Sequence, residues 1–180
     1  MNTNYIKYLL LVALILTTKI STAQSIGSDG DLSIGFGNGL YSDIKTTQLI
    51  VFYNIPELST VSGNFSVDGD VNLELISQNK STAMIAGFVP MFRYDLDLGL
   101  METFIKAGIG FNYINNHNIN NRDLGGHFIF SDMISIGTSL IKTDNFSAEI
   151  SYLFRHISNA GFFHSNEGFN SQYLVVSVMI

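Results

Sequence analysis

Several residue types are scarce or missing in this sequence of 180 residues. It contains no cysteine, which excludes disulfide bonds, thiolate metal sites and a cysteine nucleophile. Charged residues make up 13%, about half of the usual share in soluble domains. No apolar run in the body of the chain approaches the roughly 20 residues of a membrane-spanning helix. Because 46% of residues are hydrophobic, a disordered chain is also excluded. Two classes of protein remain: a soluble β-domain and a membrane β-barrel, whose apolar residues are spread out by alternation.

The N-terminus has the pattern of a secretory signal. Lys7 precedes a short apolar stretch, Leu9–Leu16, and small residues at Ser21–Ala23 come before a predicted cleavage site ahead of Gln24. We therefore expect residues 1–23 to be a signal peptide, the alternative being an uncleaved anchor, and residues 24–180 to be the mature domain. No cysteine stands at the predicted site, so a lipoprotein anchor is not supported.

The mature chain is acidic. Once Lys7 and Lys19 are removed, seven Lys and Arg residues remain against fifteen Asp and Glu residues, a formal charge of −8. Phosphate contacts need clustered Lys and Arg, so binding to nucleic acid is not expected.

Apolar and polar residues alternate with a period of two along most of the mature sequence, and this pattern predicts eight β-strands. The predicted strands are Asp31–Asn38, Thr47–Asn54, Gly63–Ser77, Ala83–Tyr94, Glu102–Tyr113, Gly126–Ile141, Asn145–Ser158 and Asn170–Ile180. Eight strands in about 157 residues match the smallest outer-membrane barrels. The predicted fold class is therefore all-β, an eight-stranded antiparallel up-and-down transmembrane β-barrel.

The third predicted strand separates polar from apolar residues most clearly. Its polar face carries Asn64, Ser66, Asp68, Asp70, Asn72 and Glu74. The opposite face carries Phe65, Val67, Val71, Leu73 and Leu75. Basic residues lie on other strands, at Arg93, Lys106 and Arg155. This pattern favours a narrow lumen, filled by side chains whose charges pair, over a soluble sandwich.

Bacterial barrels begin and end in the periplasm, and their longer loops are extracellular. The external connections are then predicted at 39–46, 78–82, 114–125 and 159–169. The seventh strand runs outward and brings His156 and Ser158 to the outer leaflet.

Common site motifs are absent or incomplete. The four histidines (117, 127, 156 and 164) do not pair at metal-ligand spacing, so we expect neither a metal site nor a cofactor. Asp68, Asp70 and Asn72 resemble half of an EF-hand loop, but Leu73 occupies the position of the turn glycine.

His156 and Ser158 lie on one face of the seventh strand, together with apolar residues, and this face is predicted to point toward lipid. Polar groups there are costly unless they serve a function. A histidine beside a serine is the minimal base–nucleophile pair, since imidazole can accept the hydroxyl proton. The alternative is that both lie in the hydrated headgroup zone at the strand end and carry no chemistry.

The segment that follows resembles the signature of the lipid A 3-O-deacylase family, the PagL-type outer-membrane acyl hydrolases. The matching residues are His156, Ser158, Asn159, Ala160, Asn166 and Gly168. The likeness continues upstream, at residues 88–94, 104–111 and 124–132. It covers roughly residues 63–180, and the last motif is the specific one.

The resemblance implies a barrel with an active site on its outer wall that cleaves the 3-O-linked acyl chain of lipid A in the outer membrane of a Gram-negative bacterium. Ser158 would be the nucleophile, and His156 the general base and then the acid. Asn159 would help to form the oxyanion hole, and Asn166 and Gly168 would position the substrate.

One position departs from the family pattern. The family has a glutamate fourteen residues after the histidine, where this chain has Asn170. Asn170 can accept the histidine N–H but cannot stabilise an imidazolium as a carboxylate does. Glu167, on the preceding loop, is a second candidate for this role, and an inactive site is a third interpretation.

Two other functions compete with the esterase. Asn170 and the asparagine-rich segment 112–121 are compatible with a non-catalytic barrel in a structural or adhesion role. A channel is disfavoured, because eight strands leave no open pore. The oligomeric state stays open.

Overall fold

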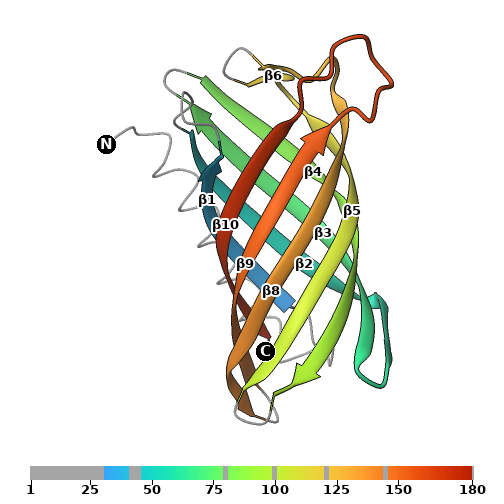
Figure 1. Ribbon diagram of the computed structural model, residues 1–180, viewed down its shortest axis with the longest axis vertical. Coiled ribbons are helices and arrows are strands. Elements are labelled where there is room, and N and C mark those ends of the chain that lie inside the picture. Colours follow the sequence, from blue (N-terminus) through green and yellow to red (C-terminus); the bar gives the residue numbers. More distant parts are fainter. Residues whose placement is uncertain are drawn as a thin grey trace.

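In the computed structural model, eight strands pair edge to edge into a closed antiparallel barrel (Figure 1). The structure describes residues 31–40, 46–78, 81–98, 101–119, 122–143 and 146–179. The barrel strands are β1 (Asp31–Gly39), β2 (Thr46–Ser62), β3 (Phe65–Gln78), β4 (Ser81–Asp97), β5 (Glu102–Ile114), β8 (Phe128–Thr143), β9 (Phe146–Ser158) and β10 (Phe169–Met179). A two-stranded hairpin, β6 (Asn118–Ile119) and β7 (Arg122–Asp123), lies between β5 and β8. The predicted signal peptide lies outside the described residues.

The sequence predicted the fold class and all eight barrel strands. The barrel closes where β1 pairs with β10, so the order around it is β1-β10-β9-β8-β5-β4-β3-β2. The main difference is β2, which was predicted to end at Asn54 but continues to Ser62. The β2–β3 register shifts between Ile55 and Thr60. Pro56 lies in this interval and has no N–H to donate to the ladder, and the pairing with β3 resumes at Thr60.

No helix in the described part of the chain is long and apolar enough to cross a membrane.

Side chains alternate between the lumen and the outer wall as predicted. Along β5, Ile105, Ile109 and Phe111 are exposed on the outside, whereas Gly108 and Asn112 are buried. The polar face of β3 is turned inward, where Ser66, Asp70, Asn72 and Glu74 are buried. The outer wall is thus mostly apolar, as expected for a membrane barrel, and the lumen holds polar side chains beside two apolar clusters.

Two pairs of opposite charges lie in the lumen. Arg155 is 1% exposed and forms an ion pair with Glu74, whose carboxylate also accepts a hydrogen bond from the Tyr173 hydroxyl. A second pair joins the two terminal nitrogens of Arg93 to the carboxylate oxygens of Glu149 at 2.9 and 2.8 Å. In these two pairs the opposite charge of the partner offsets the desolvation of each buried group. The ion pair of Arg155 also anchors β9 from inside, next to the outward-facing His156.

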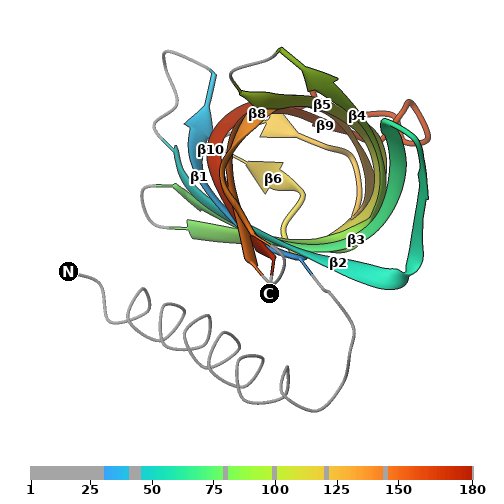
Figure 2. The ribbon, with the colours of Figure 1, turned by 90° about the horizontal axis from the view of Figure 1, so that it is seen from below.

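The β6–β7 hairpin lies across one end of the barrel, where Figure 2 shows β6 within the outline of the lumen. Ile119 and Leu124 are fully buried there. They belong to an apolar cluster with residues from the barrel strands, among them Ile114, Ile157 and Phe169. This packing closes the end of the barrel from which the connection 159–168 projects (Figure 1).

Candidate active site

His156 and Ser158 lie at the end of β9, next to the 159–168 connection (Figure 1). Their neighbours Arg155 and Ile157 are buried in the lumen, whereas His156 and Ser158 are partly exposed. Strand alternation therefore turns both side chains to the outer wall. The polar pair predicted from the sequence is thus placed on one outward face.

Asn170 is the direct partner of His156. The two residues are opposed in the β9–β10 register, and the distance between His156 Nδ1 and Asn170 Oδ1 is 2.6 Å. Because Oδ1 can only accept, we assign the tautomer in which Nδ1–H donates. The Nε2 lone pair of His156 is then available to accept a proton.

Gly168 leaves room for the imidazole. Its φ of 61° lies in the left-handed region, which favours glycine. A Cβ atom at this position would lie 2.9 Å from His156 Cε1 and 3.5 Å from Nε2. The bare backbone of Gly168 therefore forms one wall of the space that holds the ring.

Asp132 flanks His156 on the opposite side from Asn170. Asp132 on β8 is opposed to His156 in the β8–β9 register, and its side chain is exposed on the outer wall. Directly opposed residues have Cβ atoms about 4.5–5.5 Å apart. His156 is thus placed between an amide on one neighbouring strand and a carboxylate on the other.

The Ser158 hydroxyl has a backbone partner. Ala160 N–H donates to Ser158 Oγ over 3.4 Å, a long hydrogen bond. In the described part of the chain no hydrogen bond joins Ser158 to His156. Ala160 has a φ of 52°, an uncommon conformation for a residue with a side chain, so the chain turns sharply after the serine.

Asn159 organises the loop that follows. It is fully buried, and its Nδ2 group donates to the carbonyl oxygens of Leu124 and Ser165. Its Oδ1 accepts Gly161 N–H at 2.8 Å, and its own N–H donates to Asn166 Oδ1 at 2.9 Å. Both Nδ2 hydrogens are therefore committed to the backbone and do not face a substrate.

Two aromatic contacts hold the loop beside Ser158. The Phe162 ring stacks on Phe130, which is opposed to Ser158 on β8, with centroids 5.6 Å apart. The Phe163 ring lies over Gly126, where a Cβ would approach its Cε2 to 2.6 Å. The loop is thus fixed against β8 and the segment that precedes it.

Glu167 points to the β6–β7 hairpin. Its Oε2 accepts Asp123 N–H at 2.6 Å, and its carbonyl oxygen accepts from Arg122. The structure therefore brings Asn170 to His156 and engages Glu167 elsewhere.

Asp123 is the point where the hairpin meets this loop. Its carbonyl oxygen accepts Ser165 Oγ–H and Glu167 N–H. Its Oδ1 lies 2.8 Å from Gly125 N and 2.8 Å from His117 Nδ1. The Gly125 hydrogen bond, followed by that of His117, holds the pKa of Asp123 below its ordinary value of 3.8.

The sequence-predicted residues fall into two groups. His156, Ser158, Asn170 and Gly168 come together on the outer wall, whereas Asn159, Asn166 and Glu167 hold the loop. Asp132 was not predicted as a site residue from the sequence. The only feature that pointed to it was its place on the predicted strand that precedes the strand of His156. No cluster of three or more His, Asp or Glu side chains that could hold a metal ion occurs among the described residues.

Comparisons with known proteins identify the family and agree with the barrel fold. The model of the family "Lipid A 3-O-deacylase (PagL)" matches residues 32–179. Curated proteins give no match. Among solved structures, the crystal structure of the outer-membrane enzyme PagL is 24% identical, with a TM-score of 0.63, and the match covers 82% of this chain and 97% of that one. The crystal structure of Neisserial surface protein A is 13% identical, with a TM-score of 0.55 and coverages of 84% and 94%. At these identities the two structures support the fold alone.

Proposed function

Because the chain belongs to the lipid A 3-O-deacylase family, we propose that it is an outer-membrane esterase that removes the 3-O-linked acyl chain of lipid A. The family and the barrel fold support a place in the outer membrane of a Gram-negative bacterium. The arrangement that supports catalysis most directly is His156, oriented by Asn170 on the same outward face as Ser158.

In the proposed mechanism Ser158 Oγ attacks the ester carbonyl while His156 Nε2 accepts the hydroxyl proton. The tetrahedral intermediate collapses, the bond to the sugar oxygen breaks, and His156 returns the proton to that oxygen. Water, deprotonated by His156, then attacks the acyl-enzyme; the acyl–Oγ bond breaks, His156 returns the proton to Ser158 Oγ, and the fatty acid is released. The hydrogen bond from Ser158 to His156 forms in the substrate complex, since catalytic hydrogen bonds are often long before substrate binds.

The backbone of the turn after Ser158 supplies the best oxyanion donor. Ala160 N–H already points to Ser158 Oγ. A backbone donor aimed at the developing charge can contribute about 3 kcal/mol to the transition state. Asn166, whose Oδ1 holds Asn159 N–H, carries an Nδ2 group without a partner among the described residues and is a second donor. We assign Asn159 a positioning role, because its side chain fixes the turn.

Asp132 offsets the missing carboxylate at position 170. An amide at Asn170 fixes the ring but leaves the imidazolium charge uncompensated. The Asp132 carboxylate, directly opposed to His156 on β8, is placed to interact with that charge.

Mass spectrometry of lipid A tests this function. The wild-type chain and Ser158→Ala are expressed in a Gram-negative outer membrane that lacks such an activity. We expect loss of one hydroxyacyl mass with the wild type only. Heat-modifiable migration on gels checks that both barrels are folded. Equal loss of the acyl chain in both strains would refute Ser158 as the nucleophile.

A non-catalytic barrel is the second candidate, and the neutral side chain at Asn170 favours it. It predicts identical lipid A spectra with folded wild type, with Ser158→Ala and without the protein.

We also propose that residues 1–23 are a cleaved signal peptide. N-terminal sequencing of the protein from outer membranes is expected to begin at Gln24.

A further inference from the structure

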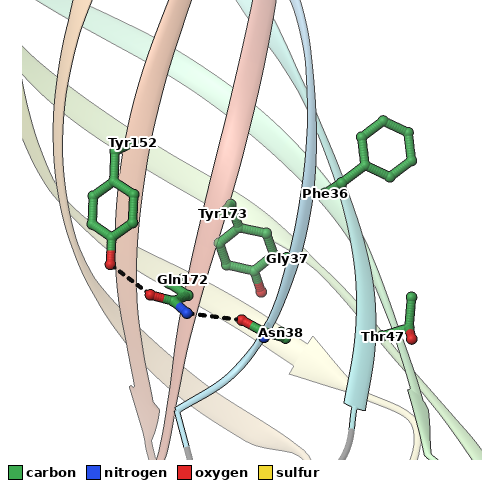
Figure 3. Close-up of a pocket in the computed structure, with 7 residues that line it drawn as sticks. All are labelled: Phe36, Gly37, Asn38, Thr47, Tyr152, Gln172 and Tyr173. Atoms are coloured by element: carbon green, nitrogen blue, oxygen red, sulfur yellow. Dashed lines mark hydrogen bonds between the residues drawn. The ribbon is translucent and has the colours of Figure 1, made fainter.

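A groove of about 480 Å³ lies on the barrel wall across β2, β1, β10 and β9 (Figure 3). Phe36 on β1 and Tyr152 on β9 line it and are 62% and 47% exposed. Asn38 and Gln172 line it between these two rings. The groove is therefore open to the outside of the barrel, the side that faces lipid.

A chain of hydrogen bonds crosses this groove. Tyr152 hydroxyl donates to Gln172 Oε1 at 2.8 Å, and Gln172 Nε2 donates to Asn38 Oδ1 at 3.0 Å (Figure 3). These two hydrogen bonds use only one of the two Nε2 hydrogens of Gln172. The Asn38 Nδ2 group has no partner among the described residues. Polar side chains on a lipid-facing wall are costly unless they serve a function.

The groove borders the candidate active site. Asn170 and Gln172 are two residues apart on the same face of β10, about 7 Å along the strand. Gln172 is opposed to Phe154, which lies four residues before Ser158, about 13 Å along β9. The groove is therefore within reach of another part of a glycolipid whose ester lies at Ser158.

We propose that this groove binds the polar junction of a second acyl chain of the lipid A substrate, one that is not cleaved. At such a junction an amide or ester linkage and a hydroxyl meet the hydrocarbon tail. Gln172 and Asn38 present donors to the linkage, Tyr152 oxygen can accept from an amide or hydroxyl, and the rings of Phe36 and Tyr152 contact the tail. The cleaved chain does not fit this role, because its own polar end is at Ser158. The proposal rests on the esterase function proposed above.

Binding to the folded barrel tests the groove without turnover. In the Ser158→Ala background, Tyr152→Phe and Gln172→Leu are combined, and titration calorimetry measures binding of purified lipid A in detergent micelles. We expect Kd to rise about tenfold, as the loss of one or two hydrogen bonds implies. Tyr94→Phe, at an exposed tyrosine on β4, is the matched control and is expected to leave Kd unchanged. Phosphatidylethanolamine is the comparison lipid.

Activity gives an independent measurement. With Ser158 restored, the rate on lipid A relative to that on p-nitrophenyl octanoate is expected to fall about tenfold in the double variant. An unchanged Kd for lipid A, or an equal loss of affinity for phosphatidylethanolamine, would overturn the proposal. If lipid A binding depends on Tyr152 and Gln172 but no ester is cleaved, the esterase function fails and the groove assignment stands.

Discussion

His156 and Asn170 are directly opposed residues of β9 and β10, and their side chains meet at 2.6 Å between Nδ1 and Oδ1. The hydrogen bond fixes the ring and its tautomer, which is one of the two tasks that an acidic residue performs in such sites. The other task, compensation of the positive charge on the ring, cannot be performed by a neutral amide. The difference between these tasks makes position 170 the most informative one to change.

Asn170→Glu is expected to raise kcat about tenfold, because a hydrogen bond to a charged acceptor is stronger than one to a neutral acceptor. Asn170→Ala is expected to lower kcat about tenfold through loss of ring orientation. Both are measured as initial rates of fatty acid release from lipid A micelles.

Glu167→Gln is the control for this pair. The amide oxygen of glutamine can still accept Asp123 N–H, so kcat is expected to stay within about threefold of the wild type. A larger effect at position 167 than for Asn170→Ala would identify Glu167 as the partner of His156 and contradict our assignment.

Asp132→Asn is expected to lower kcat about tenfold with little change in KM. Two unit charges about 6 Å apart interact by about 3 kcal/mol at an effective dielectric constant of 20, and water reduces this value at an exposed residue such as Asp132. The Asp132→Asn, Asn170→Glu double variant should recover most of the lost rate, because position 170 then supplies the charge. No recovery in a folded double variant would indicate that Asp132 acts on the substrate rather than on His156.

The sequence predicted the barrel well because its in–out pattern is local. Alternation along the strand that ends at Ser158 places His156 outward without any knowledge of the neighbours. The end of β2 was missed, because Pro56 interrupts the pattern before the strand resumes.

Cross-strand partners could not be predicted in the same way. The pairing of Asp132 with His156 depends on the β8–β9 register, which shifts between Ser139 and Ile141, and a one-residue change of register would turn Asp132 to the other face. The role of Asp123 depends on contacts with residues more than 40 positions away. The oxyanion role of Asn159 was an expectation from the family resemblance, and the sequence alone does not show the carbonyl groups of Leu124 and Ser165 that engage its side chain.

Docking of the 159–168 loop should depend on pH through Asp123, because its carboxyl fixes the Gly125 turn while its backbone holds Ser165 and Glu167 of the loop. The pKa of this carboxyl is lowered in the folded protein by the Gly125 and His117 hydrogen bonds. Its stabilising contribution is therefore fully present above the ordinary pKa of 3.8 and is lost as the pH falls through the lower value of the folded state. Hydrogen exchange of residues 159–168, corrected for intrinsic rates, should show protection that falls in this range. Asp123→Asn should lose this pH dependence, and an unchanged profile would contradict the role of Asp123.

Two glycines of the loop allow a matched test of the space around His156. Gly168 and Gly161 both have left-handed backbones, with φ of 61° and 82°, so alanine imposes similar backbone strain at each. Only at Gly168 would the new Cβ meet the imidazole, 2.9 Å from Cε1, whereas nothing lies within 4 Å at Gly161. Gly168→Ala is expected to lower kcat at least about tenfold by displacing the ring from Asn170. Gly161→Ala should retain most of the activity, and both barrels should keep their heat-modifiable migration. Equal loss of kcat in the two variants would mean that loop strain, rather than the position of His156, limits the reaction.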